Sequence, residues 1–248
     1  MSKISDANYE TIRAFRNKAQ ESLKQFKVLE EAAQSFTDLI YQEFEESIAL
    51  VRVYVTFPFG KLPSSNQTRI TNLATAKQIL PILNEKSTIL SLLGTHGEKA
   101  AWNNRHNSQG HIGIPLVSAD FIDSIPMVSR LLKEMGVPLE WVTSQNTGME
   151  AKNTLNIASV FYVPDASTAL DQRGRKIIPA QDFVKASGIK TVFGSGGTYL
   201  MSNSFATIII FCRESLTKEQ ASQFLSLASL FTFATARLVL NGKIFVDN

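Results

Sequence analysis

A polar segment between two apolar runs holds the side chains best suited to chemistry in this sequence. It covers residues 102–115 and includes Trp102, Arg105, His106 and His111. Tryptophan and arginine can stack on or ion-pair with a flat or anionic group, and imidazole titrates near neutral pH. A surface connection needs only solubility, so we expect this segment to line a small-molecule site. His111 is favoured for direct contact because it enters an apolar strand, where a polar side chain needs a partner.

A second group of candidate ligand-binding residues flanks a predicted pair of strands farther along the chain. Its members are Tyr162, Asp165, Arg173 and Lys176. They could close over the same pocket or make solvated turn contacts, as charged turn residues usually do. Trp102 and Arg105 could likewise anchor a loop instead of a ligand. Neither group identifies the ligand, so the cofactor is left unassigned.

The three histidines, His96, His106 and His111, lie close together in the sequence. Imidazole could bind a transition metal or an axial haem position, but the spacing matches no compact zinc motif. We assign no metal ligands. A histidine-using metal or haem protein is kept as an alternative function.

We assign no catalytic residues, and we favour a protein that is not an enzyme. Cys212 ends the apolar run 208–211, where a small hydrophobe is expected to be buried and inert. The run Gly194-Ser195-Gly196-Gly197 could cradle phosphate, but a phosphate loop leads into a helix and a strand follows here. This glycine run therefore predicts a tight hairpin.

Composition restricts the class of protein. A chain of 248 residues with 44% apolar residues can form one elaborated domain with a buried core. The net charge of +3 is small and the basic residues are dispersed, which argues against a nucleic-acid partner. One cysteine excludes an internal disulfide, and we see neither a signal pattern nor an uninterrupted apolar stretch for membrane insertion. A cytoplasmic protein is expected.

The pattern of apolar residues predicts the elements that position these side chains. Helical spacing over 6–48, without proline or glycine, predicts either two helical pieces that break near Lys27 or one long dimerisation helix. The β-branched run 48–57 predicts a strand closed by Pro58, and 88–93 a second strand stopped by Gly94. A helix is predicted from the Ser118 cap to Met135, with Pro126 near its first turns or dividing it. Further helices are predicted over 68–83, 179–186 and from Ser215 or Thr217 to Leu238, and further strands over 112–117, 155–163, 191–193, 198–200 and 205–212.

This order predicts an α+β fold. We expect a central antiparallel sheet of about six strands flanked by helices, with the long N- and C-terminal helices packed together. The expected division is an N-terminal helical segment, 1–47, followed by the main domain with its C-terminal helix, 48–248.

Three phrases carry a more specific resemblance: RVYVTFPFG at 52–60, GHIGIPLV at 110–117 and VFGSGG at 192–197. They resemble the GAF-like region found beside the signalling modules of bacterial sensor histidine kinases, within the GAF/PAS class of ligand-sensing domains. The resemblance implies a sheet backed on one face by the terminal helices, with a ligand pocket on its other face. The Asn-Lys-Phe-Asp-Glu signature of the cyclic-nucleotide-binding members is not found here.

The resemblance also implies a function. It suggests a non-enzymatic sensory or regulatory domain that binds a small molecule beside the sheet and signals through its terminal helices as a homodimer. A protein-interaction module without a ligand is the other alternative, because the apolar helix stripes could bind a protein partner.

Overall fold

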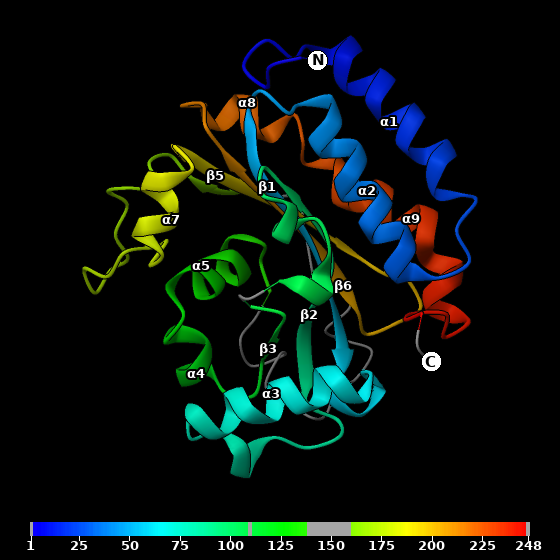
Figure 1. Cartoon of the computed structure of the whole chain (residues 1–248), viewed down its shortest axis with the longest axis vertical. Coiled ribbons are helices and arrows are strands. Elements are labelled where there is room, and N and C mark those ends of the chain that lie inside the picture. Colours follow the sequence, from blue (N-terminus) through cyan, green and yellow to red (C-terminus); the bar gives the residue numbers. More distant parts are fainter. Residues whose placement is uncertain (1, 109–110, 138–159, 247–248) are drawn as a thin grey trace.

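The computed structural model of the chain describes residues 2–108, 111–137 and 160–246. Helices pack on both faces of a single antiparallel sheet, and Figure 1 shows them on either side of it. The α-helices are α1 (Tyr9–Leu23), α2 (Leu29–Glu43), α3 (Ser64–Ala76), α4 (Ala119–Asp123), α5 (Pro126–Glu134), α7 (Gln181–Ala186), α8 (Lys218–Ser222) and α9 (Ser226–Leu240). The strands are β1 (Ile48–Pro58), β2 (Thr88–Gly97), β3 (Gly113–Pro115), β4 (Phe161–Val163), β5 (Thr191–Thr198) and β6 (Phe205–Cys212). Short 3-10 turns are η1 (Phe59–Lys61), η2 (Leu80–Ile82), η3 (Ala100–Trp102) and η4 (Arg105–Asn107).

The six strands lie in the order β3-β2-β1-β6-β5-β4, and every neighbouring pair is antiparallel. The long strands β1 and β6 occupy the centre, because both are rich in β-branched residues and almost all of their residues are buried. This arrangement confirms the predicted α+β fold with a six-stranded antiparallel sheet.

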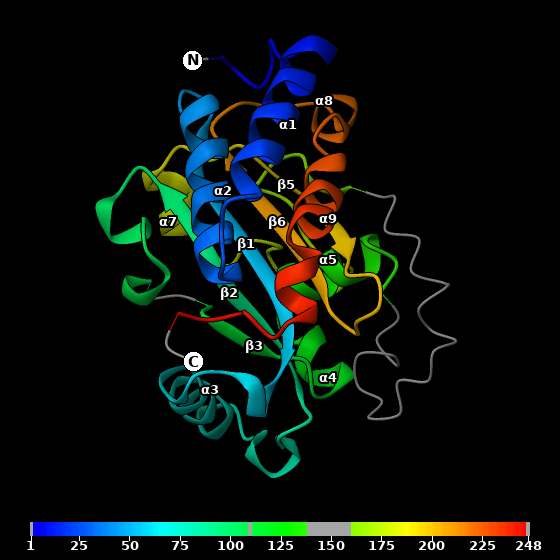
Figure 2. The ribbon, with the colours of Figure 1, turned by 90° about the vertical axis from the view of Figure 1, so that its right-hand side faces the viewer.

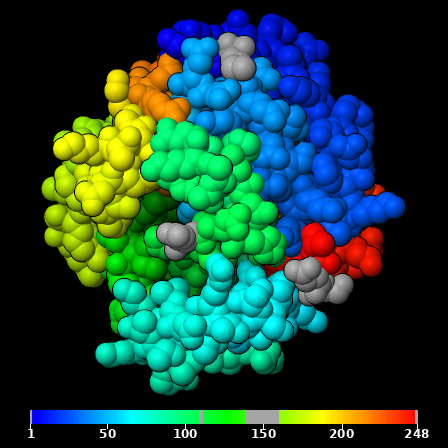
Figure 3. All heavy atoms as spheres, in the orientation of Figure 1, coloured from blue at the N-terminus to red at the C-terminus, as the bar shows by residue number. Residues whose placement is uncertain are grey.

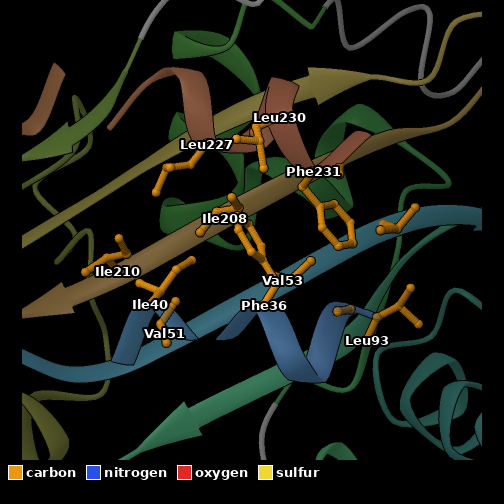
Figure 4. Close-up of a cluster of buried hydrophobic side chains, with 14 of the residues drawn as sticks. Phe36, Ile40, Val51, Val53, Leu93, Ile208, Ile210, Leu227, Leu230 and Phe231 are labelled. Atoms are coloured by element: carbon orange, nitrogen blue, oxygen red, sulfur yellow. The ribbon is translucent and has the colours of Figure 1, made fainter. Parts of the chain in front are cut away.

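One face of the sheet is covered by α2 and α9, and α1 packs against these two helices (Figure 2). Phe36 of α2 stacks on Phe231 of α9, with ring centroids 5.3 Å apart. Figure 4 shows these two rings over Val53 of β1 and Ile208 of β6. The terminal helices therefore share one apolar core with the sheet, and residues of the segment 1–47 contribute to it.

The opposite face is covered by α4, α5, α7 and the η3 turn, and it has its own apolar core. Leu50, Leu92, Ile209 and Phe211 point into this second core from the three central strands. The alternation of side chains along β1 thus serves two cores, which explains why the strand is buried almost throughout.

Several predicted boundaries are confirmed. The N-terminal helical pattern divides into α1 and α2 on either side of residues 24–28, next to Lys27. Pro126 stands at the first turn of α5 and separates it from α4. Thr217 caps α8 with a capping box in which the Gln220 side chain bonds the Thr217 N–H. The predicted strand over 155–163 lies outside the described residues up to 159, and β4 forms its end.

Two glycine predictions are wrong. Gly94 does not end β2, which continues to Gly97; a Cβ at Gly94 would lie 2.2 Å from the carbonyl oxygen of Ala33, so the glycine allows α2 to pack closely. The run 194–197 is no hairpin, because β5 passes straight through it. A Cβ at Gly197 would lie 2.7 Å from the Ala228 carbonyl oxygen of α9. These glycines therefore provide close helix–sheet contact, and the chain reverses between Tyr199 and Ser204 instead.

One stretch of the described chain, Lys218–Leu240, is long and apolar enough by composition to cross a membrane, which corrects the expectation that no such stretch exists. In this structure it forms α8 and α9; side chains such as Leu227 and Phe231 are buried against the sheet, whereas Phe233 and Leu240 are exposed. Core helices of soluble proteins can have the same length and apolar composition.

Candidate functional site

Arg105 and His106 meet a common carboxylate, on the side of the molecule where α2 lies. The Arg105 Nε donates to Glu30 Oε1 at 2.6 Å, and His106 Nε2 lies 2.9 Å from the same oxygen. Arg105 and Glu30 are both buried, and the guanidinium also lies 5.2 Å from the centre of the Phe245 ring. This ion pair joins α2, the η4 turn and the C-terminal residues, so Arg105 has a structural partner already.

Trp102 takes part in packing. Its indole meets the ring of Phe183 edge to face at 5.3 Å and lies on Gly97, where a Cβ would be 2.8 Å from the indole. The Lys99 ammonium sits 5.0 Å from the indole centre. Trp102 therefore fastens the η3 turn to the end of β2 and to α7, at the border of the second core.

His111 does not share the Glu30 carboxylate with Arg105 and His106; the charge that acts on it is that of Arg52 of β1. Burial, together with the positive charge of Arg52, lowers the pKa of His111, although part of its surface is exposed. Its backbone has a φ of 35°, a left-handed conformation that costs energy for a residue other than glycine. Gln109 and Gly110, which precede it, lie outside the described residues.

The second predicted group is spread over the connection around β4. The Tyr162 hydroxyl donates to the Leu216 carbonyl at 2.6 Å, and Lys176 Nζ donates to the Ser167 carbonyl. Asp165 caps its own turn by accepting from Ser167 and Thr168, which lowers its pKa to about 2. Arg173 pairs with Asp123 at 2.9 Å. The contacts of Asp165 and Lys176 stabilise a local turn, whereas Tyr162 and Arg173 bond residues far away in the chain. Among the contacts of the described residues, none joins these four side chains to Trp102 or His111.

His96 also has a partner of its own. Its Nδ1 lies 2.7 Å from Asp38 Oδ1, and its ring packs on Tyr41 at 4.4 Å between centroids. The three histidines thus sit in three different environments. Among the described residues no group of three or more histidine, cysteine, aspartate or glutamate side chains is placed to hold a metal ion.

The polar group that sequence reasoning missed lies in the middle of the sheet. We call it the Arg52 cluster: Arg52 and Tyr54 of β1, Thr95 of β2 and Thr207 of β6. The strand register pairs Arg52 directly with Thr95, and Tyr54 directly with Thr207. Directly paired residues point to the same face, and Leu50 and Tyr54 place that face in the second core. Three strands therefore bring four polar side chains together within an otherwise apolar surface.

Most of the hydrogen-bonding capacity of the Arg52 cluster is unused. Thr95 and Thr207 are fully buried, and within the described residues neither their hydroxyls nor the buried Nε of Arg52 has a hydrogen-bond partner. The other two guanidinium nitrogens donate to neutral hydroxyls, Nη1 to Tyr54 and Nη2 to Ser108, both at 3.2 Å. Buried polar groups are nearly always paired in folded proteins, so unpartnered donors in one place need an explanation.

The surface is hollowed over this face of the sheet. Figure 3 shows a recess between the yellow segment that holds α7, the green segment of α4 and α5, and the green segment of η3 and η4. Ser108, the acceptor of the Arg52 hydrogen bond, directly follows η4 in the chain.

Comparison with known proteins bears on the fold. Neither a protein-family model nor a curated protein matches this sequence. Solved structures do match: the GAF domain of an Acinetobacter phosphoenolpyruvate-protein phosphotransferase covers 94% of this chain and 96% of its own, at 9% identity and a TM-score of 0.48. The phycoerythrobilin-bound GAF domain of a cyanobacterial phytochrome covers 95% and 98%, at 12% identity and a TM-score of 0.46.

The chain is structurally similar to these GAF domains over almost its whole length. At these identities and TM-scores the similarity concerns the architecture alone, and we transfer no functional residue from those proteins.

Long-range strand pairing explains why the sequence analysis missed the Arg52 cluster. The run 48–57 reads as an apolar strand with one arginine in it, and a single charge in such a strand is the only signal available. Thr95 and Thr207 lie 43 and 155 residues away from Arg52 in the chain and meet it only through strand pairing.

Proposed function

We propose that this chain is a GAF-like sensory or regulatory domain that binds a small molecule over the sheet face of the Arg52 cluster. The observation that carries the proposal is the set of buried donors without partners on Arg52, Thr95 and Thr207. Leaving such groups unsatisfied costs about 1–3 kcal/mol each, a cost that a bound molecule would remove. The recess in Figure 3 gives that molecule a route of entry.

Binding without turnover is part of this proposal. The one thiol, Cys212, is fully buried, and burial raises its pKa to about 12, so it is not prepared to act as a nucleophile. The Arg52 cluster itself holds donors and a fixed positive charge, and within the described residues no carboxylate or imidazole is hydrogen-bonded to its hydroxyls. Such a set can hold and orient a ligand. A cytoplasmic location belongs to the same proposal.

The route of the signal follows from the two faces of β1. Arg52 faces the second core, whereas its neighbours Val51 and Val53 face α2 and α9 (Figure 4). A ligand that shifts β1 would therefore shift residues that pack on both long helices. Because close-packed interfaces transmit small displacements, occupancy would change how α2 and α9 pack.

We further propose that a second copy of the chain receives this change through the terminal helices. On α9, Phe233 and Leu240 are 77% and 57% exposed and lie two turns apart on the same outward face. A hollow of about 360 Å³ adjoins Phe233, between α1 and α9, and is lined by Gln20, Lys24, Ala234 and Arg237. The exposed side chains of Phe233 and Leu240 also favour the alternative, a protein-interaction module without a ligand.

Native mass spectrometry tests the ligand part of the proposal. We expect the purified protein to carry a stoichiometric mass that is lost on denaturation. The double variant Thr95→Val/Thr207→Val should lose it, whereas Thr75→Val, an exposed threonine of α3, should keep it. A chain that is empty, and that no compound of a small-molecule library stabilises, would contradict ligand binding and favour the interaction module.

Sedimentation tests the second copy. We expect self-association that weakens in Phe233→Lys and persists in Leu200→Lys, a substitution at a residue as exposed as Phe233 but in the β5–β6 turn. A concentration-independent monomer would contradict the dimer.

A further inference from the structure

The chemical class of the ligand can be inferred from the charge of the Arg52 cluster. In the described part of the chain, the other arginines that are at least partly buried pair with carboxylates: Arg105 with Glu30, Arg130 with Glu134, Arg175 with Asp171, and Arg213 with Glu98. Arg52 is partly buried and has no ion pair there; its two hydrogen-bond acceptors are the neutral hydroxyls of Tyr54 and Ser108. A guanidinium held away from water without a counter-charge is costly, so the site is short of one negative charge.

We infer that the ligand carries an oxyanion, a carboxylate or a phosphate, on an apolar body, and that Arg52 is its anchor. This inference rests on the proposed function, because it names the chemistry of that same site. The guanidinium is the side chain best matched to oxyanions, since its planar fork of N–H groups can donate two parallel hydrogen bonds. Its Nε is buried and free of any partner in the described structure, so at least one such bond is open.

The neighbours of Arg52 complete a set of donors. The Tyr54 hydroxyl accepts from Arg52, which leaves its own proton available to a ligand. Thr95 lies directly across from Arg52, and Thr207 directly across from Tyr54, so their Cβ atoms are roughly 4.5–5.5 Å from those partners. Both threonine hydroxyls are unpartnered. Donors from three strands therefore surround one position, and no carboxylate competes for them within the described residues.

The surroundings of this position specify the rest of the ligand. Leu50, Leu92 and Ile209 flank the Arg52 cluster on the same strands, and all three are nearly or fully buried. An apolar body would be buried among them, whereas a free inorganic anion would leave them without contact. An aromatic or aliphatic acid, or an organic phosphate of similar shape, fits both parts of the site.

The pKa of His111 gives an independent measure of the positive charge of Arg52. The positive charge of Arg52 and burial both lower the pKa of His111, so its neutral form is favoured beside the guanidinium. An anion bound to Arg52 would offset that charge. The pKa of His111 should therefore rise when the anion binds, a change that NMR of the imidazole protons can follow.

The experiment uses three probes of similar size: benzoate, phenyl phosphate and the uncharged benzyl alcohol. Binding is measured by calorimetry and NMR on the full chain and on Arg52→Met, with Arg13→Met on the exposed face of α1 as a control for net charge. We expect at least one anionic probe to bind more tightly than benzyl alcohol and to raise the pKa of His111. Arg52→Met should weaken that binding by about tenfold or more, and Arg13→Met should leave it unchanged. The preferred anion then separates a carboxylate ligand from a phosphate.

Two other results overturn the inference in different ways. Equal binding of benzyl alcohol and the anions, unaffected by Arg52→Met, would reject the anion while leaving the proposed small-molecule function in place. If no probe binds and the protein co-purifies with no small molecule, the proposed function fails as well.

Stability separates an anchor from a structural arginine. A buried charge that awaits a ligand does not stabilise the empty protein, so Arg52→Met should unfold at the same temperature as the unliganded wild type or higher. A clear fall in that temperature, with unaltered affinity for the probes, would show that Arg52 serves the fold.

Discussion

The side-chain amide of Gln34 bonds both backbone polar groups of Thr95. Gln34 Nε2 donates to the Thr95 carbonyl oxygen at 2.9 Å, and the Thr95 N–H donates to Gln34 Oε1 at 3.4 Å. These groups need a partner because β3 pairs only with residues 89–91, which leaves the outer edge of β2 open farther along. The Thr95 side chain faces Arg52 on the opposite side of the sheet. One residue thus connects α2 with the proposed ligand position.

The substitution Gln34→Leu tests this connection. We expect the free energy of unfolding to fall by about 1–3 kcal/mol, because the edge of β2 loses its two side-chain hydrogen bonds. The amide of Thr95 should exchange with solvent faster, as measured by hydrogen exchange and NMR. Gln25→Leu, at an exposed position between α1 and α2, is the control and should change neither quantity. Unchanged exchange at Thr95 would show that α2 does not hold this edge.

The Glu30–Arg105 ion pair leads to a second prediction, which concerns the free energy of unfolding. Both side chains are buried, so removing one leaves the other charged and without its partner. Arg105→Met should lower the free energy of unfolding by about 3–5 kcal/mol in chemical denaturation. The double variant Glu30→Leu/Arg105→Met should lose less free energy of unfolding than the sum of the losses in Glu30→Leu and Arg105→Met. Additive losses would mean that the two groups do not interact.

The same pair predicts a dependence on pH. Burial by itself raises the pKa of Glu30, but the hydrogen bond and charge of Arg105, with the Val246 N–H and His106, lower it overall below its ordinary value of 4.5. A lowered pKa in the folded state stabilises the fold above the pKa of the unfolded glutamate and loses that effect as the pH falls. The difference in stability between wild type and Glu30→Gln should therefore be largest above about pH 5 and shrink below pH 4.5. A difference that stays constant between pH 7 and pH 3 would contradict the lowered pKa.

Local patterns in the sequence were sufficient to predict the sheet and its helices. The alternation over 48–57, the proline at 126 and the cap at Thr217 act within a few residues, so each element could be placed from its own residues. The glycines at 194 and 197 were misread because their reason lies elsewhere, in the backbone of β6 and α9 that approaches them. Local spacing does not reveal an approach by distant backbone.

The candidate site illustrates the same limit. Arg105 and His106 were grouped with His111 by their nearness in the sequence, yet they bond Glu30, 75 residues away from Arg105. His111 instead feels the charge of Arg52. The partners of a polar side chain depend on which strands pair and in which register, and these are long-range properties of the fold.

A last prediction separates the roles of two residues of the polar segment. Trp102 lies at the border of the second core, and His111 lies near Arg52. Trp102→Ala should lower the free energy of unfolding by about 3 kcal/mol, because the indole packs on Gly97 and Phe183. His111→Ala should cost less than about 1 kcal/mol, since His111 is exposed and its imidazole makes no hydrogen bond with the other described residues. If His111 borders the ligand, His111→Ala should weaken benzoate binding more than Trp102→Ala does, as measured by calorimetry on both variants. A large loss of stability in His111→Ala with unchanged affinity would make His111 a structural residue and move the ligand away from it.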